Sequence, residues 1–340
     1  MKTGKAPENI LKRSVLDRIK VKNGEVWSGA GIGHDCAIFP SAAEGAMAYC
    51  TQEAVLATPG GEGTDEDAFM TMAGLVQKCA NNLAAGGARP VGAMITLFLP
   101  EETPENILRQ LMAESAEKCG ELSMEIVGGQ TRISASVNAP VAVVTGIGIT
   151  DSTRREKAAP GQDVVVSKWI GLQGTAVLAK RHEAGLLQRY PEYLVRRAQE
   201  FDRYLSILPE AEAACRAGVC AMHDASEGGI FGALWELAQG AGVGLRIDLR
   251  KLPLRQETVE VCECCNVNPY ELMSGGCLVM TAQDGPGLAA ALEAEGIPAA
   301  VVGKVTAGNG RILVNGEEIR YMNRPERDGI YENDTLQCFR

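Results

Sequence analysis

The sequence predicts a mixed fold of helices and sheets, α+β or α/β, in two domains. Its 340 residues exceed the roughly 100–200 residues of a typical single domain. Short valine-rich segments typical of strands alternate with longer segments whose apolar residues recur at helical spacing. The charged residues 151–161, which end in Ala-Ala-Pro-Gly, are typical of a linker. We therefore expect one domain over residues 1–155 and a second over residues 156–340.

The first half of the chain contains the elements of a mixed domain. Leu11, Val15 and Ile19 recur at helical spacing and predict an amphipathic helix over residues 7–20. Pro104 suits the first turn of a helix, and the apolar residues after it predict a buried helical stripe. We also expect a helix over 67–84, a loop over 53–67, and strands over 36–39, 47–51, 91–99, 124–127 and 141–149.

The second half repeats the alternation with different elements. The valine-rich residues 163–167 predict its first strand. A strand over 219–222 leads into the polar and glycine-rich residues 223–229, after which a helix begins and continues to about Gln239. Further strands are expected over 244–248, 276–281, 299–305 and 311–314, and further helices over 174–181, 192–205, 210–216 and 286–295.

The charge balance argues against nucleic-acid binding. The chain has 33 Lys and Arg against 43 Asp and Glu, a net charge of −10. Binding along a phosphate backbone needs a basic surface. A local pocket for a single nucleotide is compatible with this balance.

We expect no membrane segment and a cytoplasmic location. Residues 1–20 are charged and contain no apolar targeting segment. The longest uncharged stretch, residues 133–150, includes Asn138 and Pro140 and is typical of a strand and turn.

The eleven cysteines are scattered along a long chain, which indicates reduced thiols rather than a disulfide framework. Cys262, Cys264 and Cys265 form a C-x-C-C cluster. A structural zinc site needs four ligands, usually from two cysteine pairs, and no second pair lies nearby in the sequence. We interpret the cluster as thiols of a helix surface or of the core.

Several common site motifs are absent from the sequence. No G-x-x-x-x-G-K-[ST] segment is present, and the glycines at positions 29, 31 and 33 do not have dinucleotide-binding spacing. The sequence has no G-x-S-x-G and no H-E-x-x-H. Three histidines are too few for a histidine-rich metal site.

Three glycine-bearing segments stand out: residues 29–35, 128–131 and 223–229. Each is expected to be a loop at a strand end, where exposed N–H groups can hold a phosphate, and the third opens a helix whose N-terminus favours anions. The alternative is that these are tight turns with capping residues, with Asp224 or Ser226 as the helix cap.

Six ordered segments resemble one enzyme superfamily, the aminoimidazole ribonucleotide (AIR) synthetase-related proteins. The resemblance is closest to its hydrogenase expression/formation (HypE-like) branch. The segments cover almost the whole chain: GIGHDCAI (31–38), CTQ (50–52), ANNLAAGGARP (80–90), IVGGQT (126–131), AMHDASEGG (221–229) and ELMSGG (271–276).

The resemblance implies a two-domain α+β protomer whose N-terminal domains pair into a β-barrel in a homodimer. It implies ATP and Mg²⁺ as cofactors, bound in a cleft beside the barrel, and phosphoryl transfer to an amide-like oxygen or another small acceptor. In the hydrogenase branch, a carbamoylated C-terminal cysteine is dehydrated to a thiocyanate, which implies a protein-tail substrate and hydrogenase-maturation partners.

The resemblance also assigns site residues. Asp35, Asp224 and Glu227 match catalytic positions, and Asp35 matches a metal ligand. The positions that match cofactor-binding residues are Gly31, Gly33, His34, Thr51, Gln52, Asn81, Asn82, Gly128, Gly129, Gln130, Thr131, His223, Gly228 and Gly229.

The sequence departs from the superfamily's pattern where Mg²⁺ needs anionic oxygen ligands. Neutral residues replace the usual acids at four positions: His34, Gln52, Asn82 and Gln130. Since Mg²⁺ is usually held through carboxylates and substrate phosphates, we expect weak or absent Mg²⁺-dependent ATP turnover.

The tail departs from the pattern as well. Cys338 is followed by Phe339 and Arg340, whereas the reacting cysteine of the hydrogenase branch is terminal. We therefore expect no hydrogenase-type chemistry on Cys338.

Three functions remain open at the level of the sequence. The chain is an ATP-dependent enzyme of the hydrogenase-maturation type, a relative whose Mg–ATP site has decayed into a binding scaffold, or a different small-molecule kinase or synthetase of the superfamily. The lost acids favour the scaffold, and the intact segments 221–229 and 271–276 favour an enzyme.

Overall fold

The computed structural model describes residues 8–14, 16–18, 26–28, 30–41, 45–57, 69–150 and 157–331. The chain divides into two compact units. We call Gly24–Gly29 with Asp35–Thr153 the N-terminal unit, and the remaining residues, Met1–Asn23, Ala30–His34 and Arg154–Arg340, the C-terminal unit. Residues 8–14, 16–18 and 30–34 therefore group with the second half of the chain, although the expected first domain included them.

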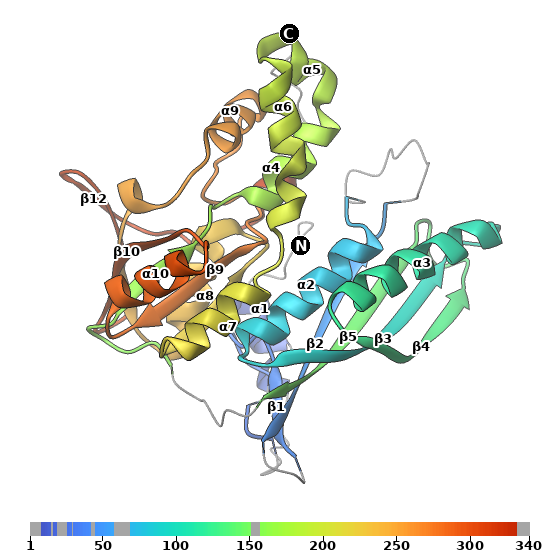
Figure 1. Ribbon diagram of the computed structural model, residues 1–340, viewed down its shortest axis with the longest axis horizontal. Helices are drawn as coiled ribbons and strands as arrows, with labels where there is room; N and C mark the ends of the chain where they lie inside the picture. Colours follow the sequence, from blue (N-terminus) through green and yellow to red (C-terminus); the bar gives the residue numbers. More distant parts are fainter. Residues whose placement is uncertain are drawn as a thin grey trace. The chain divides into compact units, whose positions relative to one another are not determined.

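The N-terminal unit is a five-stranded sheet with two helices on one face (Figure 1). The strand order is β1-β2-β5-β3-β4, and only β3 and β4 run parallel. The elements are β1 (Ala37–Pro40), β2 (Ala46–Val55), α2 (Met72–Ala85), β3 (Arg89–Leu99), α3 (Glu105–Glu121), β4 (Glu125–Ile133) and β5 (Val141–Thr150).

The two faces of this sheet differ in burial. Along β2, Ala46, Ala48 and Cys50 are buried, whereas the residues between them are more exposed. Successive strand residues point to opposite faces, so the buried set lies against α2, which is itself buried along most of its length. The opposite face, which we call the open face, carries Met94 and Ile149 at 46% and 42% exposure.

Element boundaries correct the expectations at three places. The helix α2 begins at Met72 rather than at residue 67, because the Thr71 hydroxyl caps it by accepting a hydrogen bond from the Gly74 N–H at 3.0 Å. The strand β2 continues to Val55 into the expected loop, whose residues 58–68 lie outside the described part. Pro104 is the N-cap of α3 rather than a residue of its first turn.

The C-terminal unit is built on a seven-stranded sheet of order β12-β11-β8-β10-β6-β9-β7. Its strands are β6 (Asp163–Ser167), β7 (Ala221–Ala225), β8 (Gly244–Asp248), β9 (Cys277–Ala282), β10 (Ala299–Thr306), β11 (Arg311–Asn315) and β12 (Glu318–Tyr321). Its helices are α1 (Glu8–Ser14), α4 (Leu172–Arg181), α5 (Glu183–Arg189), α6 (Glu192–Gln199), α7 (Leu208–Arg216), α8 (Gly229–Ala241), α9 (Gln256–Cys265) and α10 (Gly285–Ala294), with short 3-10 turns η1 (Leu16–Arg18), η2 (Glu200–Tyr204), η3 (Leu249–Lys251) and η4 (Gly329–Tyr331).

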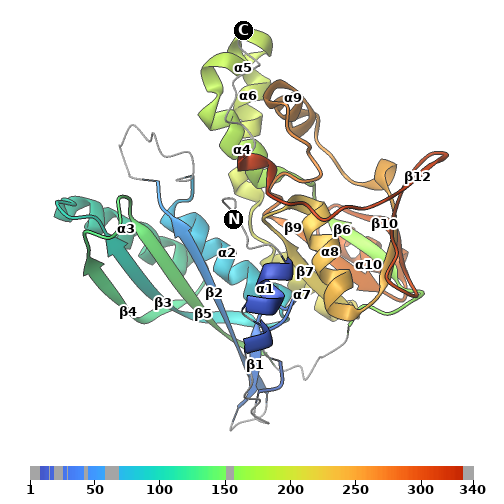
Figure 2. The same ribbon diagram turned by 180° about the vertical axis from the view of Figure 1, so that it is seen from behind.

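Helices cover both faces of this sheet (Figures 1 and 2). The helix α8 lies on one face and α10 on the other. The core on the α8 side joins Ile230 and Leu234 of the helix to Val164 and Val166 of β6. Because both faces are covered, β6 and β9 are buried along their whole length.

A helical group made of α4, α5, α6, η2 and α9 stands beside the sheet of this unit (Figure 1). The sequence patterns did not indicate α5, α9 or β12. Cys262, Cys264 and Cys265 lie in α9 and are buried, so of the two interpretations, helix-surface thiols or core thiols, the structure supports core thiols. In the described part of the chain, no group of His, Cys, Asp and Glu side chains is arranged to hold a metal ion.

Among the described residues, no helix combines the length and the apolar character that crossing a bilayer requires.

Candidate functional site

In the N-terminal unit, five of the motif residues gather around the β1–β2 pair and α2. The strands pair antiparallel with Ala37 opposite Tyr49, so Asp35, just before β1, and Thr51, two residues past Tyr49, lie at the same end of this pair. The Cys36 thiol donates a hydrogen bond to the backbone carbonyl of Asn82 at 3.1 Å. This contact brings Asp35 and Asn82 together. We call Asp35, Thr51, Gln52, Asn81 and Asn82 the motif group.

The side chains of the motif group differ in accessibility. Thr51 is exposed, and its hydroxyl lies 3.2 Å from that of Thr145 on β5. Asn81 and Asn82 are only 3% and 7% exposed, and the Asn81 amide oxygen accepts a hydrogen bond from Gln77 at 2.9 Å. By strand alternation, Gln52 shares the helix-covered face with Cys50, opposite to Thr51.

Gly128, Gly129, Gln130 and Thr131 form part of strand β4, and the expectation of a glycine loop there is wrong. They pair parallel with β3, Gly129 opposite Ile95. A Cβ atom on Gly129, which has φ +151°, would lie 1.8 Å from the Ile95 carbonyl oxygen. Glycine is therefore required for close strand approach, not for a turn.

The β4 residues are separated from Thr51 within this unit. β4 is an edge strand, and β5 and β3 stand between it and β2. Three strand spacings of about 4.8 Å put Thr51 and Gln130 about 14 Å apart across the sheet. One N-terminal unit does not bring these two motif segments together.

In the C-terminal unit, the helix α8 links the first glycine segment to His223. A Cβ atom on Gly33 would lie 2.3 Å from the carbonyl oxygen of Glu236 on α8, so residues 31–34 pack directly on this helix. His34 is exposed at the turn that Gly31 begins. The Glu236 carboxylate also lies 3.2 Å from the Nε2 atom of His223. The segments 31–34 and 221–225 therefore meet α8 along its second half.

His223 and Asp224 lie within strand β7 rather than in a loop, and they are only 4% and 3% exposed. Neither Asp224 nor Ser226 caps α8. The N-cap residue is Gly228, in the left-handed conformation with φ +84° and without a side-chain cap. The alternative interpretation, in which Asp224 or Ser226 caps the helix, is therefore wrong. Asp224 is buried on strand β7, just before the 226–229 turn.

The carboxylate of Asp328, a side chain of the protein itself, lies at this helix N-terminus, where we expected a bound anion from the sequence. Its carboxylate accepts hydrogen bonds from the N–H groups of Gly228 at 2.6 Å, Met273 at 3.1 Å and Ile330 at 2.9 Å. The next N–H, that of Gly229, donates to the Ser226 carbonyl. The donors of Gly228 and Gly229 are thus engaged inside the protein. Glu227 of the same turn is half-buried.

Asp328 is 1% exposed, and burial raises its pKa to about 7 despite the three N–H donors. It joins the motif segments 221–229 and 271–276. Sequence reasoning missed it because no local pattern connects residues 100 positions apart.

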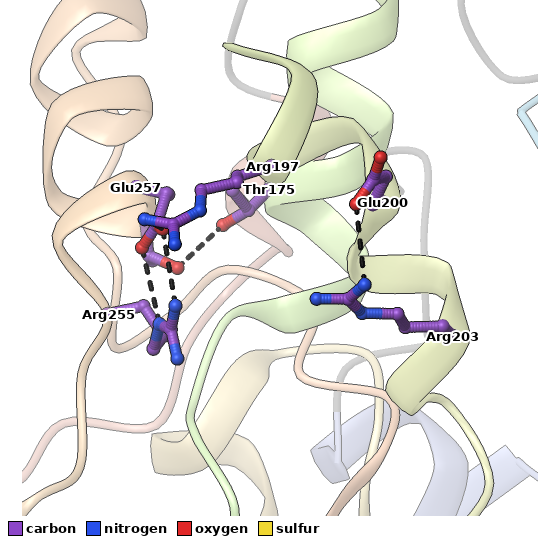
Figure 3. Close-up of polar contacts among 7 residues, drawn as sticks. Thr175, Arg197, Glu200, Arg203, Arg255 and Glu257 are labelled. Carbon is purple, nitrogen blue, oxygen red and sulfur yellow. Dashed lines mark hydrogen bonds and ion pairs between the residues drawn. The ribbon is translucent and has the colours of Figure 1, made fainter. Parts of the chain in front are cut away.

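A second polar cluster lies in the helical group (Figure 3). Arg255 donates from Nε and from Nη2 to the two carboxylate oxygens of Glu257, each at 3.2 Å, and Arg197 of α6 approaches the same carboxylate at 3.8 Å. The Arg255 guanidinium also stacks 4.8 Å from the ring centre of Trp169. This cluster joins α6 to α9. The sequence patterns did not indicate it.

The motif group does not fit a carboxylate-held Mg²⁺ ion. Asp35 is the only acid among the five residues, and Gln52, Asn81 and Asn82 offer neutral oxygens. Asn81 uses its amide oxygen within the protein. The exposed Thr51 hydroxyl and the carboxylate of Asp35, which is half-buried, are suited to hydrogen bonds with a polar ligand.

Comparisons with known proteins agree with this two-unit architecture. The family model "AIR synthase related protein, N-terminal domain" matches residues 33–150, and the model of the C-terminal domain matches residues 159–315. The chain is 30% identical over 236 residues to carbamoyl dehydratase HypE of Rhodobacter capsulatus, a match that covers 67% of each chain.

Two solved structures share the fold. The structure of a HypE–HypF complex superposes with a TM-score of 0.73 at 22% identity, covering 93% of this chain and 99% of that one. A hydrogenase maturation protein HypE in complex with ATP superposes with a TM-score of 0.67 at 19% identity, covering 96% and 97%. At these identities the superpositions establish the fold.

Proposed function

The chain belongs to the AIR synthase-related family, and from this membership we propose that it is an ATP-binding protein of the hydrogenase-maturation type. Its reaction class is phosphoryl transfer to an amide-like oxygen or another small acceptor. The relative from Rhodobacter capsulatus is named a carbamoyl dehydratase, and one structural neighbour is a complex with ATP. We do not expect nucleic acid or a membrane among the partners.

One observation carries the proposal: three motif segments that are far apart in the sequence converge in the N-terminal unit. Asp35 directly precedes β1, Thr51 lies on β2 and Asn82 on α2, and the Cys36–Asn82 hydrogen bond and β1–β2 pairing bring them together. The exposed Thr51 hydroxyl and the half-buried Asp35 carboxylate are suited to orienting a polar ligand. We assign the motif group to the nucleotide.

The composition of the motif group predicts slow turnover of ATP. When bound, Mg²⁺ would stabilise the negative charge that develops during phosphoryl transfer. With Asp35 as the one acid of the motif group, the attraction for a divalent ion is low. ATP binding through hydrogen bonds can persist while catalysis fails. A binding scaffold is therefore the second candidate function, favoured by the neutral residues Gln52 and Asn82.

An assay of ADP release separates the two candidates. The purified protein is incubated with ATP and Mg²⁺, with and without carbamoyl phosphate as the acceptor precursor. We expect slow ADP release, far below the typical enzyme turnover of about 10 s⁻¹. Turnover at ordinary enzyme rates would reject the scaffold.

We propose that the open face of the N-terminal sheet pairs with a second copy of the chain. Cross-strand pairs put Phe39, Met47 and Ile149 in one row of this face and Thr51, Thr145 and Met94 in another. Phe39, Met94 and Ile149 remain 36%, 46% and 42% exposed. An apolar face of this kind is typical of an interface, and a two-fold contact is the commonest way to cover it.

Light scattering of the full chain tests the dimer. We expect a dimeric mass at micromolar concentration and a monomeric mass for Met94→Glu, because a carboxylate would be buried between the two sheets. Ile319→Glu is the matched control, since Ile319 is 60% exposed on β12 of the other sheet. A monomeric wild type would contradict the proposal.

One candidate for the phosphoryl acceptor is a protein tail, of the kind that the resemblance to hydrogenase-maturation proteins implies. Cys338 lies outside the described residues. We expect no modification of Cys338, because Phe339 and Arg340 follow it. Mass spectrometry after incubation with ATP and a carbamoyl-donor system checks this. A mass gain localised to Cys338 would contradict it.

A further inference from the structure

Three cysteine side chains meet beneath the motif group, between the sheet and α2. The sulfur atoms of Cys50 on β2 and Cys79 on α2 lie 3.5 Å apart. The Cys50 thiol also lies 3.3 Å from the carbonyl oxygen of Cys79. Cys36, directly before β1, interacts with Cys50 as well. We call these three residues the thiol cluster.

Backbone packing holds the two closest sulfur atoms together. Gly146 of β5 lies opposite Cys50 in the sheet. A Cβ atom on Gly146 would lie 2.7 Å from the sulfur of Cys79 and 3.4 Å from that of Cys50. The absence of a side chain at Gly146 therefore leaves the space in which both sulfur atoms sit. The contact depends on three elements, β2, β5 and α2.

The thiols of the cluster differ in acidity. Interactions with the Cys36 and Cys79 side chains lower the pKa of Cys50 below the ordinary thiol value, although burial opposes this. The same interactions raise the pKa of Cys36 and of Cys79. Of the two sulfur atoms in closest contact, that of Cys50 is therefore the more easily ionised, and the thiolate is the reactive form of cysteine. Cys50 is also 6% exposed, whereas Cys79 is fully buried, so a small oxidant reaches the sulfur of Cys50 before that of Cys79.

We propose that Cys50 and Cys79 form a reversible disulfide that links β2 to α2. A peroxide is the oxidant: the Cys50 thiolate attacks one oxygen of hydrogen peroxide, the O–O bond breaks, and Cys50 becomes a sulfenic acid while hydroxide leaves. The Cys79 sulfur then attacks the Cys50 sulfur, the S–O bond breaks, and water leaves with the thiol proton. A dithiol reductant reverses the bond by thiol–disulfide exchange.

Formation of the disulfide requires only a short movement of the two sulfur atoms. A disulfide has an S–S distance of about 2.05 Å, so the two sulfur atoms must approach by about 1.5 Å. Thr51 and Gln52 directly follow Cys50, and Asn81 and Asn82 follow Cys79 by two and three residues. The bond would therefore shift β2 and α2 at the two places that present the motif group. An effect on nucleotide binding rests on the proposed function, whereas the bond itself does not.

Peptide mapping of the intact chain tests the bond. The protein is treated with hydrogen peroxide under native conditions, remaining thiols are alkylated, and the chain is digested with trypsin. Cleavage after Lys78 leaves Cys36 and Cys50 on one peptide, residues 23–78, and starts the next peptide at Cys79. We expect these two peptides joined with the loss of two hydrogen atoms, and released by dithiothreitol.

The variants make the assignment specific. Cys50→Ala and Cys79→Ala should each abolish the joined peptide. The control Cys119→Ala, which removes a buried thiol of α3 in the same unit, should leave it unchanged. Alkylation of all three cluster thiols after peroxide treatment, or a bond confined to Cys36 and Cys50, would overturn the proposal.

Titration of the oxidised and reduced protein with ATP measures how the disulfide changes ATP affinity. We expect ATP affinity to differ by at least about fivefold between the two states, and equal affinities would overturn the proposed coupling. If neither state binds ATP, the proposed function fails, and the joined peptide still decides whether the disulfide forms.

Discussion

The Asp328 carboxylate accepts a hydrogen bond from the backbone N–H of Gly228 at 2.6 Å. Two further N–H groups, from Met273 and Ile330, complete its shell. A residue near the end of the chain therefore fixes the turn that opens α8. It also joins the 271–276 segment to that turn, together with the Ser274–Ser226 backbone hydrogen bond and the close packing of Gly229 on the backbone of Glu271 and Leu272.

Removing this carboxylate should destabilise the C-terminal unit. Asp328→Ala leaves three backbone N–H groups without their acceptor, and one unsatisfied buried group costs about 1–3 kcal/mol. We expect a loss of roughly 3 kcal/mol or more in the free energy of unfolding, measured by urea denaturation. Asp284→Ala, which removes a cap hydrogen bond at the exposed N-terminus of α10, should cost only about 1 kcal/mol. Equal losses for the two variants would contradict the account.

Asp328 should also make stability depend on pH. Its pKa is raised to about 7 by burial, above the ordinary value of 3.8 that the unfolded chain has. The folded state then holds a proton that the unfolded state loses, so this contribution falls as pH rises from about 4 to about 7. The stability advantage of the wild type over Asp328→Asn should narrow between pH 5 and pH 8. A widening advantage would contradict the raised pKa.

Glu257 should make the stability of the protein depend on pH in the opposite direction from Asp328. Burial opposes ionisation of its carboxyl, but hydrogen bonds from Arg255 and the charges of Arg255 and Arg197 lower its pKa. Its contribution is therefore present above its ordinary pKa of about 4.5 and is lost as pH falls. We expect Glu257→Gln to destabilise the protein by about 1–2 kcal/mol at pH 7, with the difference shrinking below pH 4. Glu183→Gln breaks the more exposed pair with Arg196 and should cost under about 1 kcal/mol.

The close approach of β4 to β3 makes Gly129 intolerant of a side chain. Gly129→Ala would place a methyl group 1.8 Å from the Ile95 carbonyl oxygen, and we expect a destabilisation of about 4 kcal/mol or more. Gly128→Ala is the matched control, because a Cβ there meets only the end of Met94 at 3.8 Å. Its effect should be within about 0.5 kcal/mol. Thermal unfolding of the two variants measures the difference.

Local patterns predicted most elements but not their ends. The strand at 141–149 and the helix from residue 229 follow directly from valine-rich and glycine-then-apolar segments, and both are present. The helical pattern before α2 continues past the place where Thr71 caps the helix, so its start was placed five residues early. The glycine pair Gly128-Gly129 is typical of a turn. Its actual place in a strand depends on pairing with Ile95, which is distant in sequence and therefore leaves no local signal.

From the sequence, the arrangement of the candidate site could be predicted only where a local motif also determines how its residues lie in space. The convergence of Asp35, Thr51 and Asn82 depends on contacts such as that between Cys36 and Asn82, which connect residues 46 positions apart. The motif resemblance identified these residues without placing them. Asp328 has neither a motif nor a local pattern, and its role depends entirely on tertiary contact.

We propose that the chain binds ATP while its motif group holds Mg²⁺ poorly. Isothermal titration with ATP, with and without Mg²⁺, tests it most directly on the wild type, Asp35→Asn and the double variant Gln52→Asp with Asn82→Asp. We expect the wild type to bind ATP with little dependence on Mg²⁺, Asp35→Asn to bind ATP more weakly, and the double variant to bind ATP more tightly when Mg²⁺ is present. Absence of ATP binding to the wild type, or tight binding that strictly requires Mg²⁺, would contradict the proposed function.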